Sequence, residues 1–251
     1  MPYTGMGMRS PAAGVARFQP ASDQSLLVYF GETITPQARE CVLKLLRLLE
    51  SEPIRGVRNL HPAYSSLLIK FDALTLRHDE LQTTLRNYLG RLDSVQLPPP
   101  RLVEIPVCYG GEFGPDLANV AELHNLTPEK AIEAHASATY TVCFLGFAPG
   151  FAYLGGLPEA LATPRLGAPR RRVPAGSVGI AGHQTGVYPF STPGGWRLIG
   201  RTPLKMFRAE RPGRVWAVLA ARYKQMSLLA IGDHVRFTPV SRERFTELES
   251  A

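Results

Sequence analysis

The stretch VQLPPPRLVEIP, residues 95–106, divides the chain into two parts. Its three consecutive prolines cannot continue a helix and favour a stiff, extended spacer. Before this stretch, strand-like runs alternate with two amphipathic helices. After it, two short helices give way to apolar runs of strand length between loops rich in glycine and proline. We therefore predict a disordered lead-in over residues 1–12, a first domain over 13–97 and a second domain over 98–251.

The first domain has the pattern of a small α+β sandwich. The strand-like runs ARFQP and SLLVYF precede an amphipathic helix, TPQARECVLKLLRLLES, in which Thr35 can cap the N-terminus and Pro36 occupies the first turn. IRGVRNLHPAYSSLLIKFD then predicts two strands, and a second amphipathic helix follows and stops around Gly90. The order β, β, α, β, β, α predicts helices on one face of a mainly antiparallel sheet.

The second domain has the pattern of a β-barrel or a sandwich. It opens with the strand RLVEIPVCY and two short helices, PDLANVAELHN and TPEKAIEAHASA, the latter with Thr127 as N-cap and Pro128 at the first helical position. The runs TYTVCFLGF, SVGIAG, VWAVLAA and HVRFTPV then alternate with turn-rich loops. Strands separated by turn signals in this way are typical of barrels and sandwiches.

Composition narrows the class of protein. The chain has 251 residues and a hydrophobic fraction of 45%, which are ordinary values for a globular protein, and it contains no apolar run of about 18 residues that would cross a membrane. Three cysteines without CxxC spacing are typical of reduced thiols, so we expect a cytoplasmic protein. The net charge of +7 favours an anionic partner. Because the positive residues are dispersed, a small anion or an acidic protein surface is favoured over nucleic acid.

The loop FLGFAPGFAYLGGLP, residues 144–158, is the first of two loops with functional content. Its glycines allow backbone to approach a ligand closely, and the rings of Phe147, Phe151 and Tyr153 can form an apolar wall. The alternative is that these aromatic residues belong to the core and the glycines to turns.

The second loop is HQTGVYPFSTPGGWRLIGRT, residues 183–202. TPGGW is a plausible tight turn, and the neutral polar side chains around it offer donors and acceptors that suit the orientation of an amide or carboxylate. His183 has no second His or Cys at ligand spacing, so we predict no metal here. The sequence also lacks GxxxxGK[ST], GxSxG, HExxH and CxxC, which excludes a P-loop and removes the common hydrolase and zinc signatures.

Three further residues are candidates for the site. His135 lies at the end of a helix just before the strand that leads into the first loop, where the helix C-terminus would favour a protonated imidazole. The alternative is a structural histidine with satisfied hydrogen bonds. Arg165 and Arg170 are candidate anion clamps, because a guanidinium matches carboxylate and phosphate geometry. A solvated basic loop is the alternative for both.

The two loops and the segments around them resemble a known family. The string PVCYGG…GPDL…AHAS..Y.V.FLGFAPGFAYLG.LP…TPR…PR..VPAGSVGIAG.QTGVYP..TPGGW.LIGRT is similar to the 5-oxoprolinase B-subunit family, also called allophanate hydrolase subunit 1 or the Kip-type kinase inhibitor family. The likeness is strong over residues 101–207 and weaker before them. It implies a ferredoxin-like N-terminal domain and a cyclophilin-like β-barrel C-terminal domain, in an α+β chain.

The resemblance also implies an activity and a set of partners. In this family, the B subunit works with a homologous barrel protein, the C subunit, together with the A subunit, to convert 5-oxoproline to glutamate at the expense of ATP. We expect the B and C subunits to phosphorylate the lactam oxygen and the A subunit to open the ring. ATP with Mg²⁺ would then bind at a site shared with the C subunit, and no bound metal or organic cofactor is expected in this chain. The chain alone would be inactive.

The site residues follow from matching the motif position by position. The predicted catalytic residues are His135, Gln184 and Tyr188. The predicted substrate-binding residues are Gly146, Phe147, Pro149, Gly150, Phe151, Tyr153, Arg165, Arg170, Thr185, Thr192, Gly194, Gly195 and Trp196. His183 occupies a free position of the motif, which weakens any mechanism that depends on it.

Two other functions remain open. The inhibitor label implies a regulatory protein that docks on a sensor histidine kinase, with the barrel as the interaction surface. The third hypothesis is a carboxyltransfer protein that acts on urea with carboxybiotin. It requires a biotin carboxylase as partner, and this chain carries no biotin-attachment motif.

Overall fold

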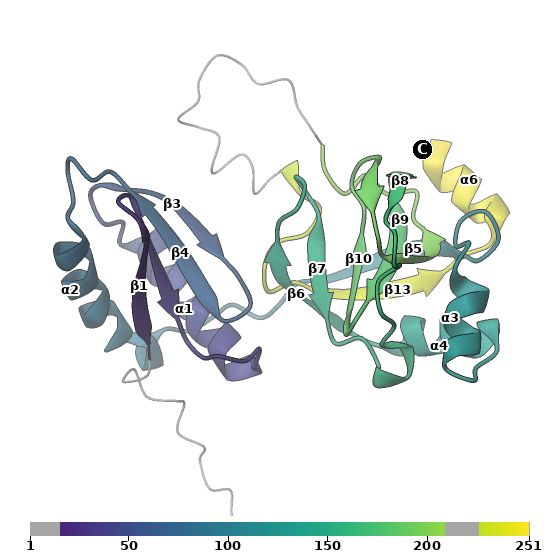
Figure 1. Cartoon of the computed structure of the whole chain (residues 1–251), viewed down its shortest axis with the longest axis horizontal. Helices are drawn as coiled ribbons and strands as arrows, with labels where there is room; N and C mark the ends of the chain where they lie inside the picture. Colours follow the sequence, from purple (N-terminus) through teal and green to yellow (C-terminus); the bar gives the residue numbers. More distant parts are fainter. Residues whose placement is uncertain (1–15, 209–225, 251) are drawn as a thin grey trace, which may run out of the picture. The chain divides into compact units, whose positions relative to one another are not determined.

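The computed structural model of the chain describes residues 16–208 and 226–250. The chain divides between Pro99 and Pro100, within the proline run, into two compact units (Figure 1). Two predicted features, the lead-in over residues 1–12 and the strand VWAVLAA over 215–221, lie outside the described residues.

The first unit is a four-stranded sheet with two helices. Its elements are β1 (Arg17–Ser22), β2 (Ser25–Tyr29), α1 (Pro36–Ser51), β3 (Val57–Pro62), β4 (Ser66–Phe71) and α2 (His78–Leu89), followed by a short 3₁₀ turn, η2 (Leu92–Ser94). The sheet order is β1-β2-β4-β3, and all three pairs are antiparallel. Because β4 lies between β2 and β3, the β2-α1-β3 segment is a split β-α-β unit, as in ferredoxin-like domains.

Helix α1 shows how local sequence sets these elements. The Thr35 hydroxyl accepts a hydrogen bond from the Ala38 N–H at 3.1 Å, and Pro36 fills the first turn, so the predicted N-cap is confirmed. Val42 and Leu45 are fully buried on the apolar stripe, and α1 packs against β3, β4 and α2. The second helix ends at Leu89, next to the predicted stop at Gly90.

The second unit contains a closed barrel. Its strands are β5 (Leu102–Tyr109), β6 (Tyr140–Leu145), β7 (Ala152–Gly155), β9 (Ser177–Ala181), β10 (Gln184–Val187), β12 (Arg197–Arg201) and β13 (His234–Pro239). They are joined in the order β10-β7-β6-β13-β5-β12-β9, and pairing of β9 with β10 closes the ring. Among these described strands only β13 and β5 pair in parallel. The predicted fold class, a mixed α/β chain with a β-barrel, is confirmed.

Smaller elements decorate the barrel. They are α3 (Leu117–Leu123), α4 (Pro128–Ser137), the 3₁₀ turn η3 (Glu159–Leu161), the two-stranded sheet of β8 (Arg170–Val173) with β11 (Thr192–Gly194), and α6 (Arg242–Ser250). The Thr127 hydroxyl accepts from the Lys130 N–H at 3.3 Å, as predicted for the cap of α4, and α4 packs on β13. In the described part of the chain every helix is too short or too polar to cross a lipid bilayer.

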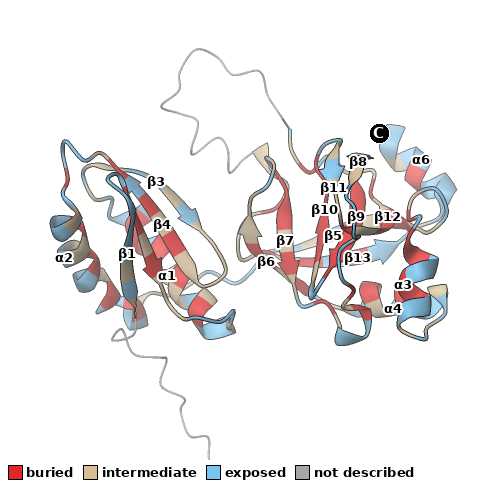
Figure 2. Cartoon of the chain, in the orientation of Figure 1, coloured by how far each residue is buried: buried red, intermediate tan, exposed pale blue. Residues whose placement is uncertain are grey.

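Buried side chains fall into two clusters in this unit. The larger one fills the barrel interior with mainly aliphatic residues together with Tyr140 and Phe237. Figure 2 shows the buried positions along the barrel strands and on α3 and α4. The smaller one is made of Phe151, Val173, Ala181, Tyr188, Trp196 and Leu198. This second cluster contains three of the residues that the sequence predicts for the site, and it lies beside the barrel core.

Gly114 lies very close to the backbone of barrel strand β12. A methyl group at this position would lie 2.0 Å from the carbonyl oxygen of Ile199 on β12. Because backbone cannot move away as a side-chain tip can, we expect Gly114→Ala to lower the free energy of unfolding of the barrel by at least about 2 kcal/mol. Tryptophan fluorescence during urea unfolding measures this, since both tryptophans belong to the second unit.

Gly167→Ala is the matched control, because a methyl group there would meet nothing within 4 Å and the residue has no left-handed backbone. It should leave the midpoint unchanged or raise it slightly. Equal effects of the two substitutions would contradict the close approach at Gly114.

Candidate functional site

The structure brings the two predicted loops together. Strands β7 and β10 are neighbours in the barrel, with Tyr153 opposite Gly186. The ring of Phe151, from the first loop, lies 5.3 Å from the ring of Tyr188 and 5.5 Å from that of Trp196, both from the second. All of these contacts are edge-to-face, the arrangement that aromatic quadrupoles favour.

Strand β10 divides the predicted site residues between two faces of the sheet. Thr185 is fully buried and hydrogen-bonds to a residue of the barrel interior, and Val187 belongs to the barrel core. Gly186 lies on the opposite face, where a methyl group would meet the rings of Phe151 and Trp196 at 3.2 Å. Since side chains alternate along a strand, Gln184 shares the outer face with Gly186 and not with Thr185.

Two glycines make the outer face flat. Gly179 on β9 pairs with Gly186 on β10, and a methyl group on Gly179 would lie 3.1 Å from Trp196 Cβ. The missing side chains let the rings lie against strand backbone. We call the rings of Phe151, Tyr153, Tyr188 and Trp196, over this floor of Gly179 and Gly186, the aromatic platform.

Most of the aromatic platform is packed and not open. Phe151, Tyr188 and Trp196 are 2%, 2% and 4% exposed, so they form a small core and not the ligand-facing wall that the sequence predicted. Burial raises the pKa of the Tyr188 phenol, which keeps it protonated at neutral pH. Gly194 leaves room for that phenol, since a methyl group there would lie 2.5 Å from its oxygen. Tyr153 is half-buried and forms the accessible edge of the platform.

Phe147 differs from the other rings because it is 62% exposed and has a backbone φ of +69°. The Ala148 N–H donates to the Gly146 carbonyl at 2.8 Å, which makes Phe147 the centre of a tight γ-turn. A second hydrogen bond, from the Gly146 N–H to the Phe151 carbonyl, closes the loop at 3.1 Å. A γ-turn with positive φ is rare and strained, above all for a bulky residue.

The other loop residues support this turn. A methyl group on Gly146 would lie 2.3 Å from the ring of Phe144, and Gly150 has a φ of +81° with Phe207 Cβ 2.7 Å from where its own Cβ would be. Pro149 is exposed between them. These two glycines therefore have steric reasons to be present that do not require a ligand.

Arg170 is occupied by an ion pair. Its guanidinium donates to Asp116 Oδ1 at 2.7 Å, and the other oxygen of Asp116 accepts from the Leu198 N–H at 2.7 Å. Asp116 is only 8% exposed, so this pair is a partly buried strut between β8, α3 and β12. Arg170 therefore has a structural role, and its role as an anion clamp stays a prediction. Asp116 is the residue that sequence reasoning missed, because its partners lie 54 and 82 positions away along the chain.

Arg165 is in the opposite situation. Its side chain is exposed, and among residues 16–208 and 226–250 no carboxylate forms an ion pair with it. Its backbone is held on both sides, since the Leu166 N–H donates to the Gly195 carbonyl at 2.8 Å and Arg197 Nε donates to the Pro164 carbonyl at 3.3 Å. The guanidinium charge partly offsets the effect of burial, which raises the pKa of the Tyr153 and Tyr188 phenols.

His135 lies inside the barrel and is fully buried. Its Nδ1 is 2.7 Å from the Tyr109 hydroxyl, and its Nε2 is 2.9 Å from the Thr185 hydroxyl. Thr185 donates its own proton to the Gly179 carbonyl at 3.1 Å, so it must accept from His135, which places the imidazole proton on Nε2. Tyr109 then donates to Nδ1.

Burial, not the helix end, decides the charge of this histidine. Desolvation lowers the pKa of His135 from 6.5 to about 3, so the imidazole is neutral at physiological pH. The prediction that the C-terminus of α4 would favour the protonated form is therefore wrong. His135 also stacks on Phe237 at 4.6 Å, within the barrel core. It can position other residues, but it does not reach the surface.

The remaining predicted residues do not converge on one point. Gln184 begins β10 and Tyr188 directly follows its last residue, which separates their Cα atoms by roughly 13 Å at the usual rise of a strand. Thr192 Oγ1 is buried and, within the described part of the chain, has no hydrogen-bond partner. His183 lies in the two-residue turn between β9 and β10, 71% exposed, and pairs with Glu159 at 3.1 Å. His183 precedes the start of β10, three residues before Gly186 in the floor of the aromatic platform.

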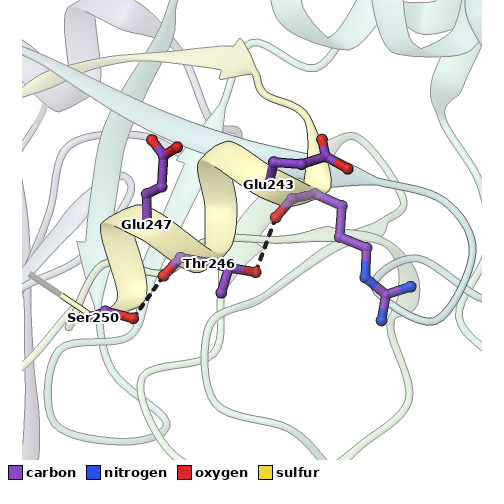
Figure 3. A pocket seen from close by; sticks show the side chains of 5 residues that line it. Glu243, Thr246, Glu247 and Ser250 are labelled. Atoms are coloured by element: carbon purple, nitrogen blue, oxygen red, sulfur yellow. Dashed lines mark hydrogen bonds between the residues drawn. The ribbon is translucent and has the colours of Figure 1, made fainter.

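Other features of the described residues add no second candidate. A hollow along α6 is lined by Arg242, Glu243, Thr246, Glu247 and Ser250, none of which belongs to the predicted site (Figure 3). Two of these side chains are used in hydrogen bonds to the helix backbone, from Thr246 and from Ser250. No cluster of three or more His, Cys, Asp or Glu side chains suited to a metal occurs in the described ranges.

The buried His135 makes stability depend on pH. Between about pH 6.5 and pH 3 the unfolded chain binds a proton that the folded barrel excludes. The contribution of neutral His135 to the free energy of unfolding is therefore full above pH 6.5 and is lost as the pH falls toward 3. We expect a slope of about 1.4 kcal/mol per pH unit in this window. His135→Gln should lose this slope in urea unfolding at graded pH, whereas His183→Gln, an exposed control, should keep it. A slope that is unchanged in His135→Gln would contradict the neutral buried imidazole.

The comparisons with known proteins agree with this architecture. Residues 16–217 match the family model described as carboxyltransferase domain, subdomain C and D. The 5-oxoprolinase B subunit of Bacillus subtilis is 40% identical over 233 residues, covering 89% of this chain and 92% of that protein. The 5-oxoprolinase B subunit of Escherichia coli O157:H7 is 54% identical over 142 residues, covering 57% of this chain and 60% of that protein.

A solved structure extends the comparison. The protein TTHA0988 superimposes with a TM-score of 0.72 at 33% identity, over 87% of this chain. This chain covers 40% of that protein, which is therefore much the longer of the two. The family model spans most of this chain, and the Bacillus subtilis relative matches it at nearly full length. The chain therefore belongs to the carboxyltransferase-domain family of subdomains C and D and, within it, to the 5-oxoprolinase B-subunit proteins.

Proposed function

We propose that this chain is the B subunit of an ATP-dependent 5-oxoprolinase, which acts with the A and C subunits to convert 5-oxo-L-proline to L-glutamate. The observation that carries the proposal is the match to the Bacillus subtilis 5-oxoprolinase B subunit, at 40% identity over nearly the full length of both chains. The relative is named as one part of a complex. The described site of this chain lacks a hydrolytic constellation of its own, which agrees with a division of labour between subunits.

The proposed chemistry begins with activation of the lactam. Transfer of the γ-phosphoryl group of ATP to the lactam oxygen forms a phosphorylated imidate and releases ADP. Two water molecules then complete the reaction, breaking the ring C–N bond and releasing phosphate with glutamate. Because an amide carbonyl is a poor electrophile, phosphorylation of its oxygen supplies the leaving group that hydrolysis needs.

The chain contributes binding and orientation in this scheme. The outward amide of Gln184 has both a donor and an acceptor, which suits a lactam N–H and C=O. The sequence contains no P-loop, so we place ATP with Mg²⁺ at a site shared with the C subunit. The guanidinium of Arg165 is exposed and has no ion-pair partner among the described residues, so it offers a positive charge that an anionic group can bind.

The activity test combines the three purified proteins. We expect no turnover from this chain alone and 5-oxoproline-dependent ATP hydrolysis once its A and C partners are added. Gln184→Ala and Tyr188→Phe should each lower kcat/KM by roughly tenfold or more, which corresponds to one lost hydrogen bond to the reacting group or its support. His183→Ala is the control and should change kcat/KM less than about twofold, since that side chain is exposed at a hairpin tip.

Two results would count against this proposal. Absence of turnover in a well-folded mixture of all three subunits would refute the function. A larger loss in His183→Ala than in Gln184→Ala would refute the assignment of the site while leaving the function intact.

Carboxyltransfer is the second candidate, because the matching family model is described as a carboxyltransferase domain. This activity would require a biotin-carrying partner, since the chain has no biotin-attachment motif. Incorporation of labelled carbonate into urea in the presence of a biotin carboxylase would support it over 5-oxoproline cleavage.

A further inference from the structure

Two side chains beside the aromatic platform are reachable from solvent. Phe147 is 62% exposed although it is a large apolar residue, and its ring lies 6.3 Å from that of Tyr188. Arg165 is exposed on the segment that is hydrogen-bonded to the TPGGW turn, whose Gly194 packs against the Tyr188 phenol. The charge of Arg165 acts to lower the pKa of the Tyr188 phenol, so its guanidinium lies near the residue that the ring of Phe147 also approaches.

The backbone holds Phe147 in this position at an energetic cost. An exposed phenylalanine gains little from burial, and its positive φ would suit glycine better. The hydrogen bonds of Gly146 and Ala148 fix the turn, and the ring of Phe147 stays mostly exposed although one edge contacts the ring of Phe151 at 5.4 Å. Strained backbone of this kind is concentrated at ligand-contacting sites.

Arg165 is distinguished from its neighbours by what surrounds it. Arg170 is neutralised by Asp116, and Arg172 Nε donates to Ser191 at 3.0 Å. Arg165 has a fixed backbone and an exposed guanidinium, so it can present two parallel N–H groups to an oxyanion without breaking an existing ion pair among the described residues.

We propose that Phe147 and Arg165 form a recognition subsite for a small flat ring that carries a carboxylate. The guanidinium of Arg165 binds the carboxylate, and the ring of Phe147 packs on the flat face of the ligand. The proposal rests on the proposed function, because 5-oxoproline is a five-membered lactam with one carboxylate. The further claim is that Phe147 and Arg165 are the residues that select this substrate over an uncharged lactam. A guanidinium also matches phosphate, so the test separates the two anions.

The first experiment measures KM and kcat for 5-oxoproline in the three-subunit mixture. We expect Arg165→Gln to raise KM by roughly 10- to 100-fold with little change in kcat, since it removes a charged hydrogen bond formed in the ground state and the transition state alike. Arg171→Gln is the matched control, because it removes the same charge from an exposed neighbouring position. Equal KM values in the two variants would overturn the proposal.

Phe147→Gly gives a readout that a structural role would not produce. It should raise KM several-fold while leaving the thermal midpoint unchanged or higher, because glycine adopts the positive φ without strain and little buried surface is lost. A lower midpoint together with an unchanged KM would show that Phe147 serves the fold and would overturn its role in recognition.

The second experiment observes binding without turnover. Amide and guanidinium NMR signals of the full chain are followed while 5-oxo-L-proline, 2-pyrrolidinone or inorganic phosphate is added. We expect shifts at Phe147 and Arg165 with 5-oxo-L-proline, much weaker shifts with 2-pyrrolidinone, and their loss in Arg165→Gln but not in Arg171→Gln.

The outcomes separate this proposal from the proposed function. Shifts that are as large with phosphate as with 5-oxo-L-proline would assign the subsite to a phosphate group and overturn it. No shift with any of the three compounds would also overturn it. Turnover that fails in the wild-type mixture while these shifts appear would refute the proposed 5-oxoprolinase activity but leave the carboxylate subsite standing.

Discussion

The hydrogen bond between His135 Nε2 and the Thr185 hydroxyl fixes which face of β10 looks outward. A strand that slips by one residue exchanges its two faces, so register in a closed barrel must be specified by groups that only one register satisfies. Thr185 links His135 to the Gly179 carbonyl, and Tyr109 satisfies the other imidazole nitrogen. A register with Gly186 in this place would offer no side-chain acceptor and would leave the buried imidazole N–H of His135 without a partner, at a cost of about 1–3 kcal/mol.

The outer face depends on that choice. With Thr185 inward, Gly186 faces outward opposite Gly179, and the rings of Tyr188 and Trp196 can lie on the strands. The Asp116–Arg170 pair then holds β8 and β12 beside the platform. Tyr153, Phe147 and Arg165 remain accessible at its edge. Within the described residues the chain therefore presents a positioning surface with an available cation, and it offers no strong acid, base or nucleophile there.

Local signals in the sequence were enough for most elements of the fold. The N-caps at Thr35 and Thr127 act within three residues, and the division of the chain falls inside the proline run. The site was harder to predict. The sequence identified the two loops that meet, but their residues belong to two faces of one strand. The contacts of Asp116 and the neutral state of His135 depend on burial by distant segments, which no local pattern contains.

The choice of face can be tested at one position. Thr185→Val keeps the shape of the side chain and adds apolar surface, but it removes the oxygen that accepts from His135. Thr185→Ser does the reverse, because it keeps this oxygen and removes a methyl group. The decisive measurement is the free energy of unfolding of both variants, followed by tryptophan fluorescence. We predict that Thr185→Val is the less stable by about 1 kcal/mol or more, because it leaves a buried N–H unsatisfied. Equal stability, or greater stability of Thr185→Val, would show that apolar packing alone sets this strand and would contradict the account.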